Sequence, residues 1–212
     1  MHNALMRLCT GGLLVATLAY LILAPLWVTT LLIAAILLLI LTTEWPHLAH
    51  GWLWLLTPVY PVAPFLLAIL LNQNNEYRFM LIFLVVCVAT HDTGAYVAGK
   101  LFGKDKLCPT ISPGKTWQGF FGGCLSVAVL LFFGTLYTAS EISAMSILLV
   151  AATIAVVATA GDLFESWLKR RAGLKDSGFL LPGHGGFLDR FDGMMSCMYL
   201  LYFYKDVVAR WF

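Results

Sequence analysis

Charged side chains are scarce in this sequence. Its 212 residues include 13 Lys or Arg and 11 Asp or Glu, so only 11% are charged, whereas 60% are apolar and the mean hydropathy is +0.85. A soluble domain carries about 25% charged residues, and so few charges could not cover a globular surface. The composition argues against a soluble fold, a disordered chain and a nucleic-acid-binding protein. It predicts an all-α polytopic membrane protein, a helical bundle.

Paired cysteine motifs are also absent. None of the five cysteines forms a CxxC pair, and four lie in apolar runs. We interpret them as packing residues, not as a disulfide framework or a metal site. They are Cys9, Cys87, Cys108, Cys124 and Cys197.

Long uncharged runs predict about seven transmembrane segments. The run from Leu8 to Thr43 is too long for one span of about 20 residues, and Pro25 in its middle predicts two helices, about 8–24 and 26–43. Arg7 before this run resembles the start of a signal peptide, but no long hydrophilic region follows, so an uncleaved helix is expected. The remaining predicted segments are 48–71, kinked or broken by Pro58, Pro61 and Pro64, then 79–98, 120–137, 144–160 and a last one from about 193.

Most of the charge lies in two polar stretches, Gly99–Gln118 and Asp162–Asp192. The two segments between them form an out-and-back hairpin, which places both stretches on one side of the membrane. Because these stretches hold nine of the 13 basic residues, the positive-inside rule assigns them to the cytoplasm and the link Thr138–Ser143 to the other side. No internal repeat or linker is visible. We expect one membrane domain, with membrane helices in 1–76 and a catalytic region in 77–212.

The first polar stretch combines an acid with a glycine-lysine segment. Asp92 lies near the end of an apolar helix, where an acid is costly and is a candidate functional group. Ser112-Pro113-Gly114-Lys115-Thr116 precedes a predicted helix, so its backbone N–H groups and Lys115 could hold phosphate oxygens. It is not a Walker motif, because Pro109 stands where that motif needs glycine. A basic connecting loop would look similar.

The second stretch is more specific. Asp162, Glu165, Ser166 and Lys169 recur at i, i+3, i+4 and i+7, which places them in one stripe on a helix. A solvated helix face is the alternative, but an apolar run leads directly into the stripe. Further on, a glycine-rich segment around His184 precedes a pair of acids at i, i+3. Two adjacent carboxylates repel unless a cation joins them, and oxygen ligands indicate Mg²⁺. The other histidines, His2, His47, His50 and His91, are interpreted as structural.

These residues resemble a known family. The segments Ser166–Arg170, Lys175–Gly178 and Pro182–Asp192 are similar to the C-terminal signature of phosphatidate cytidylyltransferases, the CDP-diacylglycerol synthases, and Asp92–Tyr96 with Ile111–Trp117 resembles a second block of that family. The resemblance covers roughly residues 77–212. The sequence departs from the family at Gln118, where glutamate is more common, and in its shorter N-terminal region.

The resemblance implies the reaction CTP + phosphatidate → CDP-diacylglycerol + pyrophosphate, with Mg²⁺ and a second cation, at the cytoplasmic face of a bacterial inner membrane. The implied catalytic residues are Asp162, Ser166, Lys169, Arg170, Asp189 and Asp192, and the implied metal ligands are Asp162, Asp189 and Asp192. The implied substrate-binding residues are Asp92, Ser112, Lys115, Thr116, Lys175, Asp176, His184, Gly185, Gly186 and Arg190. Whether the chain forms a homodimer stays open.

Three alternatives remain. A CTP-dependent polyprenol or dolichol kinase would transfer the γ-phosphate, but the intact second stretch argues against it. A cytidylyltransferase for an ether or isoprenoid lipid phosphate would share the same polar residues. A transporter or channel would use intramembrane charges and broken helices, yet no inverted repeat is present and the charges gather at one face.

Overall fold

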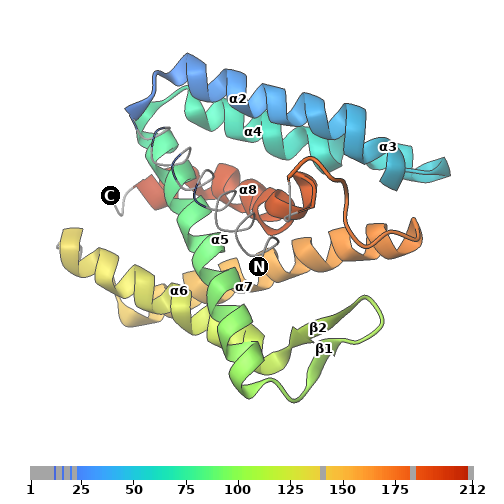
Figure 1. The fold of residues 1–212 in the computed structure, drawn as a ribbon. Coiled ribbons are helices and arrows are strands. Elements are labelled where there is room, and N and C mark those ends of the chain that lie inside the picture. The colour runs from blue at the N-terminus through green and yellow to red at the C-terminus, as the bar shows by residue number, and fades with distance from the viewer. Residues whose placement is uncertain are drawn as a thin grey trace.

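The computed structural model describes residues 12, 16, 20, 23–138, 142–181 and 185–209. These residues form a bundle of helices with one small β-hairpin (Figure 1). Five helical segments are long and apolar enough to cross a membrane, namely 26–48, 51–72, 75–102, 117–136 and 144–171. The prediction of an all-α integral membrane protein is confirmed.

The predicted break at Pro25 is confirmed. Helix α2 (Leu26–Leu39) begins directly after this proline, which cannot donate the backbone hydrogen bond that a continuing helix would need. It continues through a π-helical turn, η1 (Ile40–Glu44), into the short α3 (Trp45–Leu48). Most of the predicted segment 8–24 lies outside the described residues.

The proline-rich third segment is broken, as predicted. It consists of a 3₁₀ helix η2 (Gly51–Leu56), a distorted turn η3 (Pro58–Val62) and helix α4 (Ala63–Asn72). Tyr60 inside η3 has extended backbone angles, with φ −144° and ψ 110°. The kink lies where three prolines remove backbone donors, and it turns the chain so that α4 packs beside α2.

A β-hairpin follows the long helix α5 (Asn75–Phe102). Strand β1 (Lys106–Cys108) pairs antiparallel with β2 (Ser112–Thr116), and helix α6 (Trp117–Thr138) begins at once. The helix predicted after Ser112–Thr116 is present, but the sequence analysis did not predict that this segment forms a strand. The segment is too short and too rich in turn residues for a period-two pattern to indicate a strand, and its partner lies only four residues upstream.

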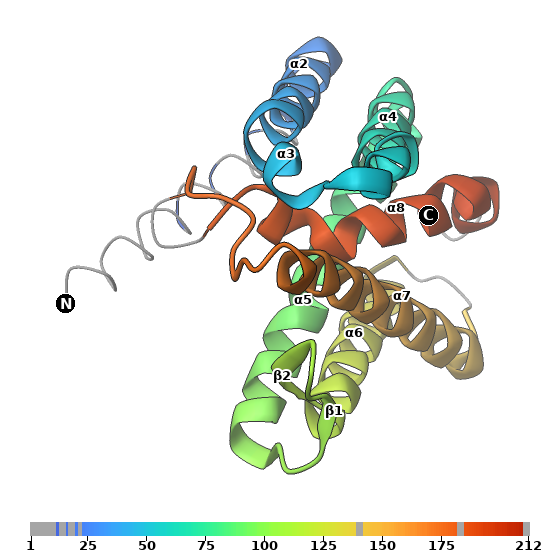
Figure 2. The ribbon, with the colours of Figure 1, turned by 90° about the vertical axis from the view of Figure 1, so that its right-hand side faces the viewer.

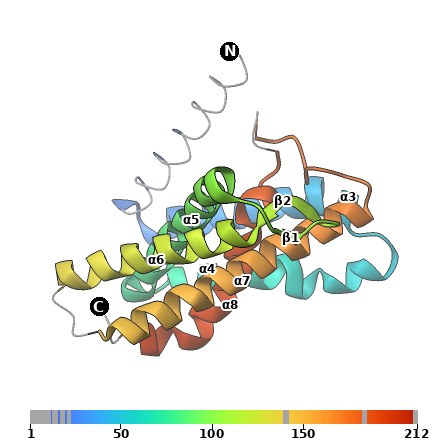
Figure 3. The same cartoon turned by 90° about the horizontal axis from the view of Figure 1, so that it is seen from below.

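Helices α5 and α6 pack closely through small residues. A Cβ atom on Gly119 would lie only 2.8 Å from the carbonyl oxygen of Ala95 on α5. A larger residue at position 119 would push the two helices apart, and small residues commonly allow such close packing in membrane bundles. The packing fixes the hairpin beside the end of α5, because α5 leads into the hairpin and α6 leads out of it (Figure 3).

The last two helices are α7 (Ala144–Arg171) and α8 (Leu188–Val208). The predicted seventh segment forms α8, which is a helix but is not among the five spans long and apolar enough to cross a membrane. Figures 1 and 2 show α8 between the α2–α4 pair and a second layer made by α5, α6 and α7.

Two buried clusters hold these layers together. One joins α5, α6, α7 and α8. The other joins the N-terminal segments to the end of α7 and the start of α8, and its fully buried members include Ile40, Trp45, Leu168, Leu188 and Met195. Chain segments more than 120 residues apart thus meet beside the polar residues described next.

Candidate active site

The two polar stretches lie together. Lys115 at the end of β2 forms an ion pair with Asp162 on α7. The Arg170 Nε donates a hydrogen bond to the Ile111 carbonyl oxygen at 3.3 Å. The prediction that the two stretches share one face of the bundle is confirmed by these contacts. In Figure 3 the hairpin lies against α7.

The predicted polar stripe of Asp162, Glu165, Ser166 and Lys169 lies on α7, and most of it is buried. Glu165 is fully buried, Ser166 and Lys169 are 8% and 9% exposed, and only Asp162 is half-buried. Ser166 Oγ donates to Asp162 Oδ1 at 3.3 Å, and Lys169 Nζ donates to Glu165 Oε2 at 3.0 Å. The alternative of a solvated helix face is thereby excluded, because such charges are buried only when paired.

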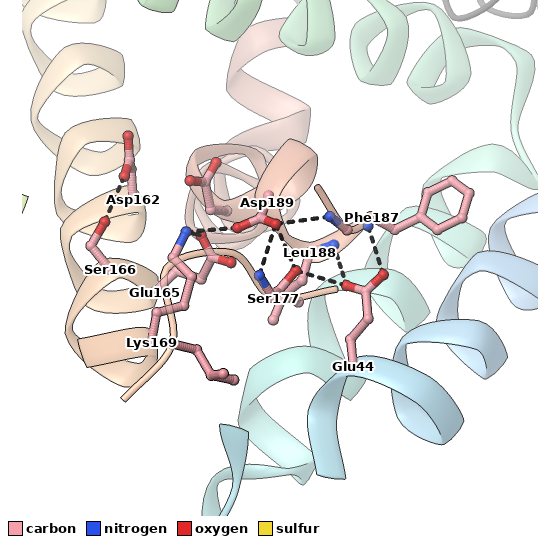
Figure 4. A network of polar contacts seen from close by, with 12 residues as sticks. Glu44, Asp162, Glu165, Ser166, Lys169, Ser177, Phe187, Leu188 and Asp189 are labelled. Atoms are coloured by element: carbon pink, nitrogen blue, oxygen red, sulfur yellow. Dashed lines mark hydrogen bonds and ion pairs between the residues drawn. The ribbon is translucent and has the colours of Figure 1, made fainter. Parts of the chain in front are cut away.

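Asp189 binds both α7 and the glycine-rich loop, which is the segment 172–187 between α7 and α8 (Figure 4). Its Oδ1 accepts from Lys169 Nζ at 2.7 Å. Its Oδ2 accepts from the backbone N–H of Ser177 at 2.9 Å and that of Gly186 at 2.8 Å. Burial alone would raise the pKa of Asp189, but these hydrogen bonds stabilise the ionised form and hold its pKa below the ordinary value.

Asp192 lies in a different electrostatic environment. Burial and the neighbouring negative charges of Asp162 and Asp92 raise the pKa of Asp192 to about 7, while a hydrogen bond from the Gly193 N–H opposes the shift. Asp92 is thus close enough for its charge to act on Asp192, and its predicted role in substrate binding stays a prediction. Repulsion of this kind marks a place where a cation would be stabilised.

Close approach of α7 and α8 creates this cluster. A Cβ atom on Gly161 would lie 2.7 Å from the Asp192 carbonyl oxygen, and one on Gly193 would lie 3.1 Å from the Ala158 carbonyl oxygen. The two helices therefore cross at glycines directly beside the two acids. Each acid is placed by the glycine next to it in sequence.

Several predicted substrate-binding residues have structural partners. The Thr116 hydroxyl is buried and accepts the Gly119 N–H at 3.1 Å, so it caps α6. Ser112 lies in β2 opposite Cys108. Lys175, Asp176 and Arg190 have exposed side chains near the site. Their assignment to substrate stays a prediction.

The glycine-rich loop is described in part. Leu181 N–H donates to the Gly185 carbonyl oxygen at 2.9 Å, and Gly185 has φ 79°, a conformation that favours glycine. A Cβ atom there would lie 2.5 Å from Asp189 Oδ2. The predicted contact of His184 with substrate lies outside the described residues, as do Pro182 and Gly183.

Gln118, the departure from the family pattern, holds the base of the hairpin. Its Nε2 donates to Asp105 Oδ2 at 2.7 Å, and its Oε1 accepts from the backbone N–H groups of Lys104 and Asp105 at 3.1 and 3.2 Å. A glutamate could not donate to Asp105. The amide therefore suits this chain, whose residue 105 is an acid.

Glu44 was not predicted as a site residue. It lies at the end of η1, is fully buried, and accepts hydrogen bonds from the loop and from the start of α8. The available signal was the one used for Asp92: a single acid closing a long apolar run. Its partners are more than 130 residues away in sequence, so the pattern could not identify them.

The carboxylates provide oxygen ligands of the kind Mg²⁺ prefers. Within the described part of the chain, no group of three His, Cys, Asp or Glu side chains is placed to enclose a metal ion. However, Glu165 Oε1 is buried without a hydrogen-bond partner, and Asp192 is destabilised by neighbouring acids. An orphaned oxygen beside repelling carboxylates fits a bound cation. The ligand set Asp162, Asp189 and Asp192 stays a prediction.

Comparison with known proteins identifies the family. Residues 3–208 match the sequence model of the cytidylyltransferase family. The chain belongs to this family. It is 38% identical over 189 residues to the phosphatidate cytidylyltransferase of Haemophilus influenzae, covering 80% of this chain and 65% of that protein. It is 45% identical over 131 residues to the phosphatidate cytidylyltransferase of Staphylococcus epidermidis, covering 61% of this chain and 50% of that protein.

A third relative, the phosphatidate cytidylyltransferase of Brucella suis, is 40% identical over 145 residues, which cover 66% of this chain and 52% of the relative. The chain thus spans about half to two thirds of the length of the curated relatives it matches. Family membership agrees with the resemblance seen in the two polar stretches.

Proposed function

We propose that this protein transfers the cytidylyl group of CTP to phosphatidate, forming CDP-diacylglycerol and pyrophosphate. The observation that carries the proposal is the convergence of Lys115, Asp162, Lys169, Asp189 and Asp192 at one end of apolar helices in a cytidylyltransferase-family chain. A site with both charged groups and lipid-facing walls suits one water-soluble and one lipid substrate. The names of the relatives support this choice of substrates.

The chemistry needs charge neutralisation more than a strong base. An oxygen of the phosphatidate phosphate attacks the α-phosphorus of CTP, a new P–O–P linkage forms, and the bond to the β-phosphate breaks so that its electrons leave with pyrophosphate. The attacking phosphate is already ionised, so no residue must remove a proton from it. Catalysis then rests on positioning the two substrates and stabilising negative charge.

The cations of the site have distinct places in this reaction. Lys115 lies against Asp162, close enough to the acid cluster to approach a nucleotide phosphate held there. Lys169 is fixed by Glu165 and Asp189, so it holds the loop and adds positive charge to the site. Arg170 and Arg190 are assigned to the phosphates or the leaving pyrophosphate.

Asp162 and Asp192, with Asp189, would hold Mg²⁺. A bound Mg²⁺ supplies charge neutralisation to the phosphates of CTP. A second cation is part of the same proposal. We assign the site to the cytoplasmic face of a bacterial inner membrane, since the basic residues gather at this end of the helices and CTP is a cytoplasmic metabolite.

The test is the fate of label in CTP. Purified full chain in detergent micelles is incubated with phosphatidate and CTP labelled on either the α- or the γ-phosphate. We expect the α-label in lipid and the γ-label in pyrophosphate. Transfer of the γ-label to lipid with release of CDP would instead establish a lipid kinase and overturn the proposal.

The lipid acceptor is tested in the same assay. Phosphatidate, an ether-linked phosphatidate and an isoprenoid phosphate are compared at equal mole fraction in the micelle. The proposal predicts the highest kcat/KM for phosphatidate. A preference of tenfold or more for one of the other two lipids would reassign the substrate while leaving the cytidylyl transfer in place.

A further inference from the structure

We infer that Glu44, from the N-terminal helix, is a positioning residue of the active site. The structure assigns to it the task of holding the loop and helix start that carry Asp189. Its role in catalysis rests on the proposed function, whereas its role in ordering the loop does not. Glu44 acts through other residues and touches no reacting atom.

Glu44, at the end of η1, joins the N-terminal segment to the start of α8. Its Oε1 accepts the Phe187 N–H at 2.7 Å, and its Oε2 accepts the Leu188 N–H at 2.8 Å and the Ser177 hydroxyl at 3.0 Å (Figure 4). The side chain is completely buried. A buried carboxylate with three donors is held firmly, because each donor would otherwise be desolvated without a partner.

The loop is shaped around this side chain. A Cβ atom on Gly178 would lie 2.9 Å from Glu44 Cγ, and one on Gly186 would lie 2.5 Å from Glu44 Oε2. Larger residues at either position would displace the carboxylate. The two glycines therefore leave the space that Glu44 fills, which explains why glycine stands at both position 178 and position 186.

A direct path leads from Glu44 to the charged site. The Ser177 hydroxyl lies 3.0 Å from Glu44 Oε2 and 3.0 Å from Asp189 Oδ2. Asp189 in turn accepts from Lys169 Nζ at 2.7 Å. One hydroxyl proton can serve only one acceptor at a time, so Ser177 couples the two carboxylates. A shift of Glu44 would therefore move Asp189 and Lys169, both through Ser177 and through the backbone at Phe187 and Leu188.

The backbone of η1 supports the same conclusion. Glu44 is the last residue of a π-helical turn inside an otherwise regular span. Such turns insert one residue and change the direction in which the following side chains project, and they are frequent at functional sites. The turn directs a carboxylate from an apolar helix into a loop that lies over 130 residues further along the chain.

A carboxylate is required here, not simply a hydrogen-bonding group. All three partners of Glu44 donate, and a glutamine amide would place its own N–H groups opposite at least one of them. Glu44→Gln keeps the size of the side chain but loses this match. Glu44→Asp keeps the charge but is one methylene shorter.

The experiment compares Glu44→Gln, Glu44→Asp and the control Glu76→Gln in the purified full chain. Glu76 is exposed at the start of α5, away from the loop. For Glu44→Gln we expect kcat to fall about 10- to 100-fold with each KM within about threefold, since the interaction positions groups for the transition state. The kcat of Glu44→Asp should be about 2- to 5-fold higher than that of Glu44→Gln, because the carboxylate is kept. The kcat of the control Glu76→Gln should stay within twofold of the wild type.

Amide hydrogen exchange supplies a readout independent of activity. In Glu44→Gln the amides of Ser177, Phe187 and Leu188 should exchange at least tenfold faster, while those in the middle of α7 stay unchanged. A wild-type protein without transfer activity would defeat the proposed function, yet this exchange pattern would still establish the positioning role. Unchanged exchange at these amides, or a kcat within twofold of the wild type in an active protein, would overturn the inference.

Discussion

At the scale of single residues, the site divides its acids between two tasks. Asp189 is saturated by hydrogen bonds from Lys169, Ser177 and Gly186, and its pKa is lowered. Asp192 is buried beside other acids, and its pKa is raised to about 7. The first environment fixes the position of the Asp189 carboxylate, and the second would be relieved by a cation beside Asp192. Neutralising either acid should therefore impair the protein for different reasons.

Asp192→Asn should abolish transfer without unfolding the protein. We expect kcat to fall about a thousandfold, because a ligand of the phosphate-neutralising cation is lost, while the elution volume in detergent and the Tm stay close to those of the wild type. Asp206→Asn on the same helix is the matched control. Asp206 is exposed and accepts the Tyr77 hydroxyl at 2.6 Å, so this variant should keep its activity. Near-normal activity in Asp192→Asn would contradict the assignment of Asp192 as a metal ligand.

At the scale of helices, glycines decide which acids meet. Helices α7 and α8 approach closely at Gly161 and Gly193, and this crossing brings Asp162 to Asp192. Because interiors are densely packed, one extra methyl group at such a crossing moves both helices apart. The geometry of the acid cluster is thus a property of the contact between elements, not of either helix alone.

Gly161→Ala should weaken both stability and activity. The added Cβ would lie 2.7 Å from the Asp192 carbonyl oxygen, and overpacking of this kind costs about 1–3 kcal/mol. We expect a lower Tm together with at least a tenfold fall in kcat/KM.

Gly134→Ala on α6 is the control for Gly161→Ala, because a Cβ there meets nothing within 4 Å. It should be neutral or slightly stabilising, since alanine favours helices. Equal effects of the two substitutions would show that the close crossing of α7 and α8 does not matter.

The sequence predicted these elements unevenly. The spacing of Asp162, Ser166 and Lys169 indicated a single polar stripe because helical periodicity is local. The hairpin at 106–116 was missed because its strands are too short to show a period. Glu44 was missed because its partners are distant in sequence, and only the folded chain shows which residues complete its hydrogen bonds.

At the scale of the whole molecule, the few charged residues gather at one end of an otherwise apolar helical bundle. Five segments are long and apolar enough to cross a membrane. The polar residues at the ends of α5 and α7 and at the starts of α6 and α8 converge through Lys115, Asp162, Lys169 and Asp189. The segment 26–48 is joined to this polar end, since Glu44 accepts hydrogen bonds from Phe187 and from Leu188 at the start of α8.

The orientation of this bundle is testable with reporters. A reporter inserted in the link Thr138–Ser143 should be active only outside the cytoplasm, and one inserted in the hairpin turn near Pro109 should be active only inside it. The reason is the concentration of basic residues in the two polar stretches. A cytoplasmic signal from the link would overturn the assignment of the site to the cytoplasmic face.

The most direct measurement is incorporation of α-labelled CTP into lipid by the purified full chain, with phosphatidate present and Mg²⁺ added or chelated. The account predicts labelled CDP-diacylglycerol that increases linearly with protein, stops in excess chelator and returns when Mg²⁺ is restored, with Asp192→Asn as the blank. No α-label in lipid from the folded wild-type protein, or undiminished incorporation in excess chelator, would contradict it.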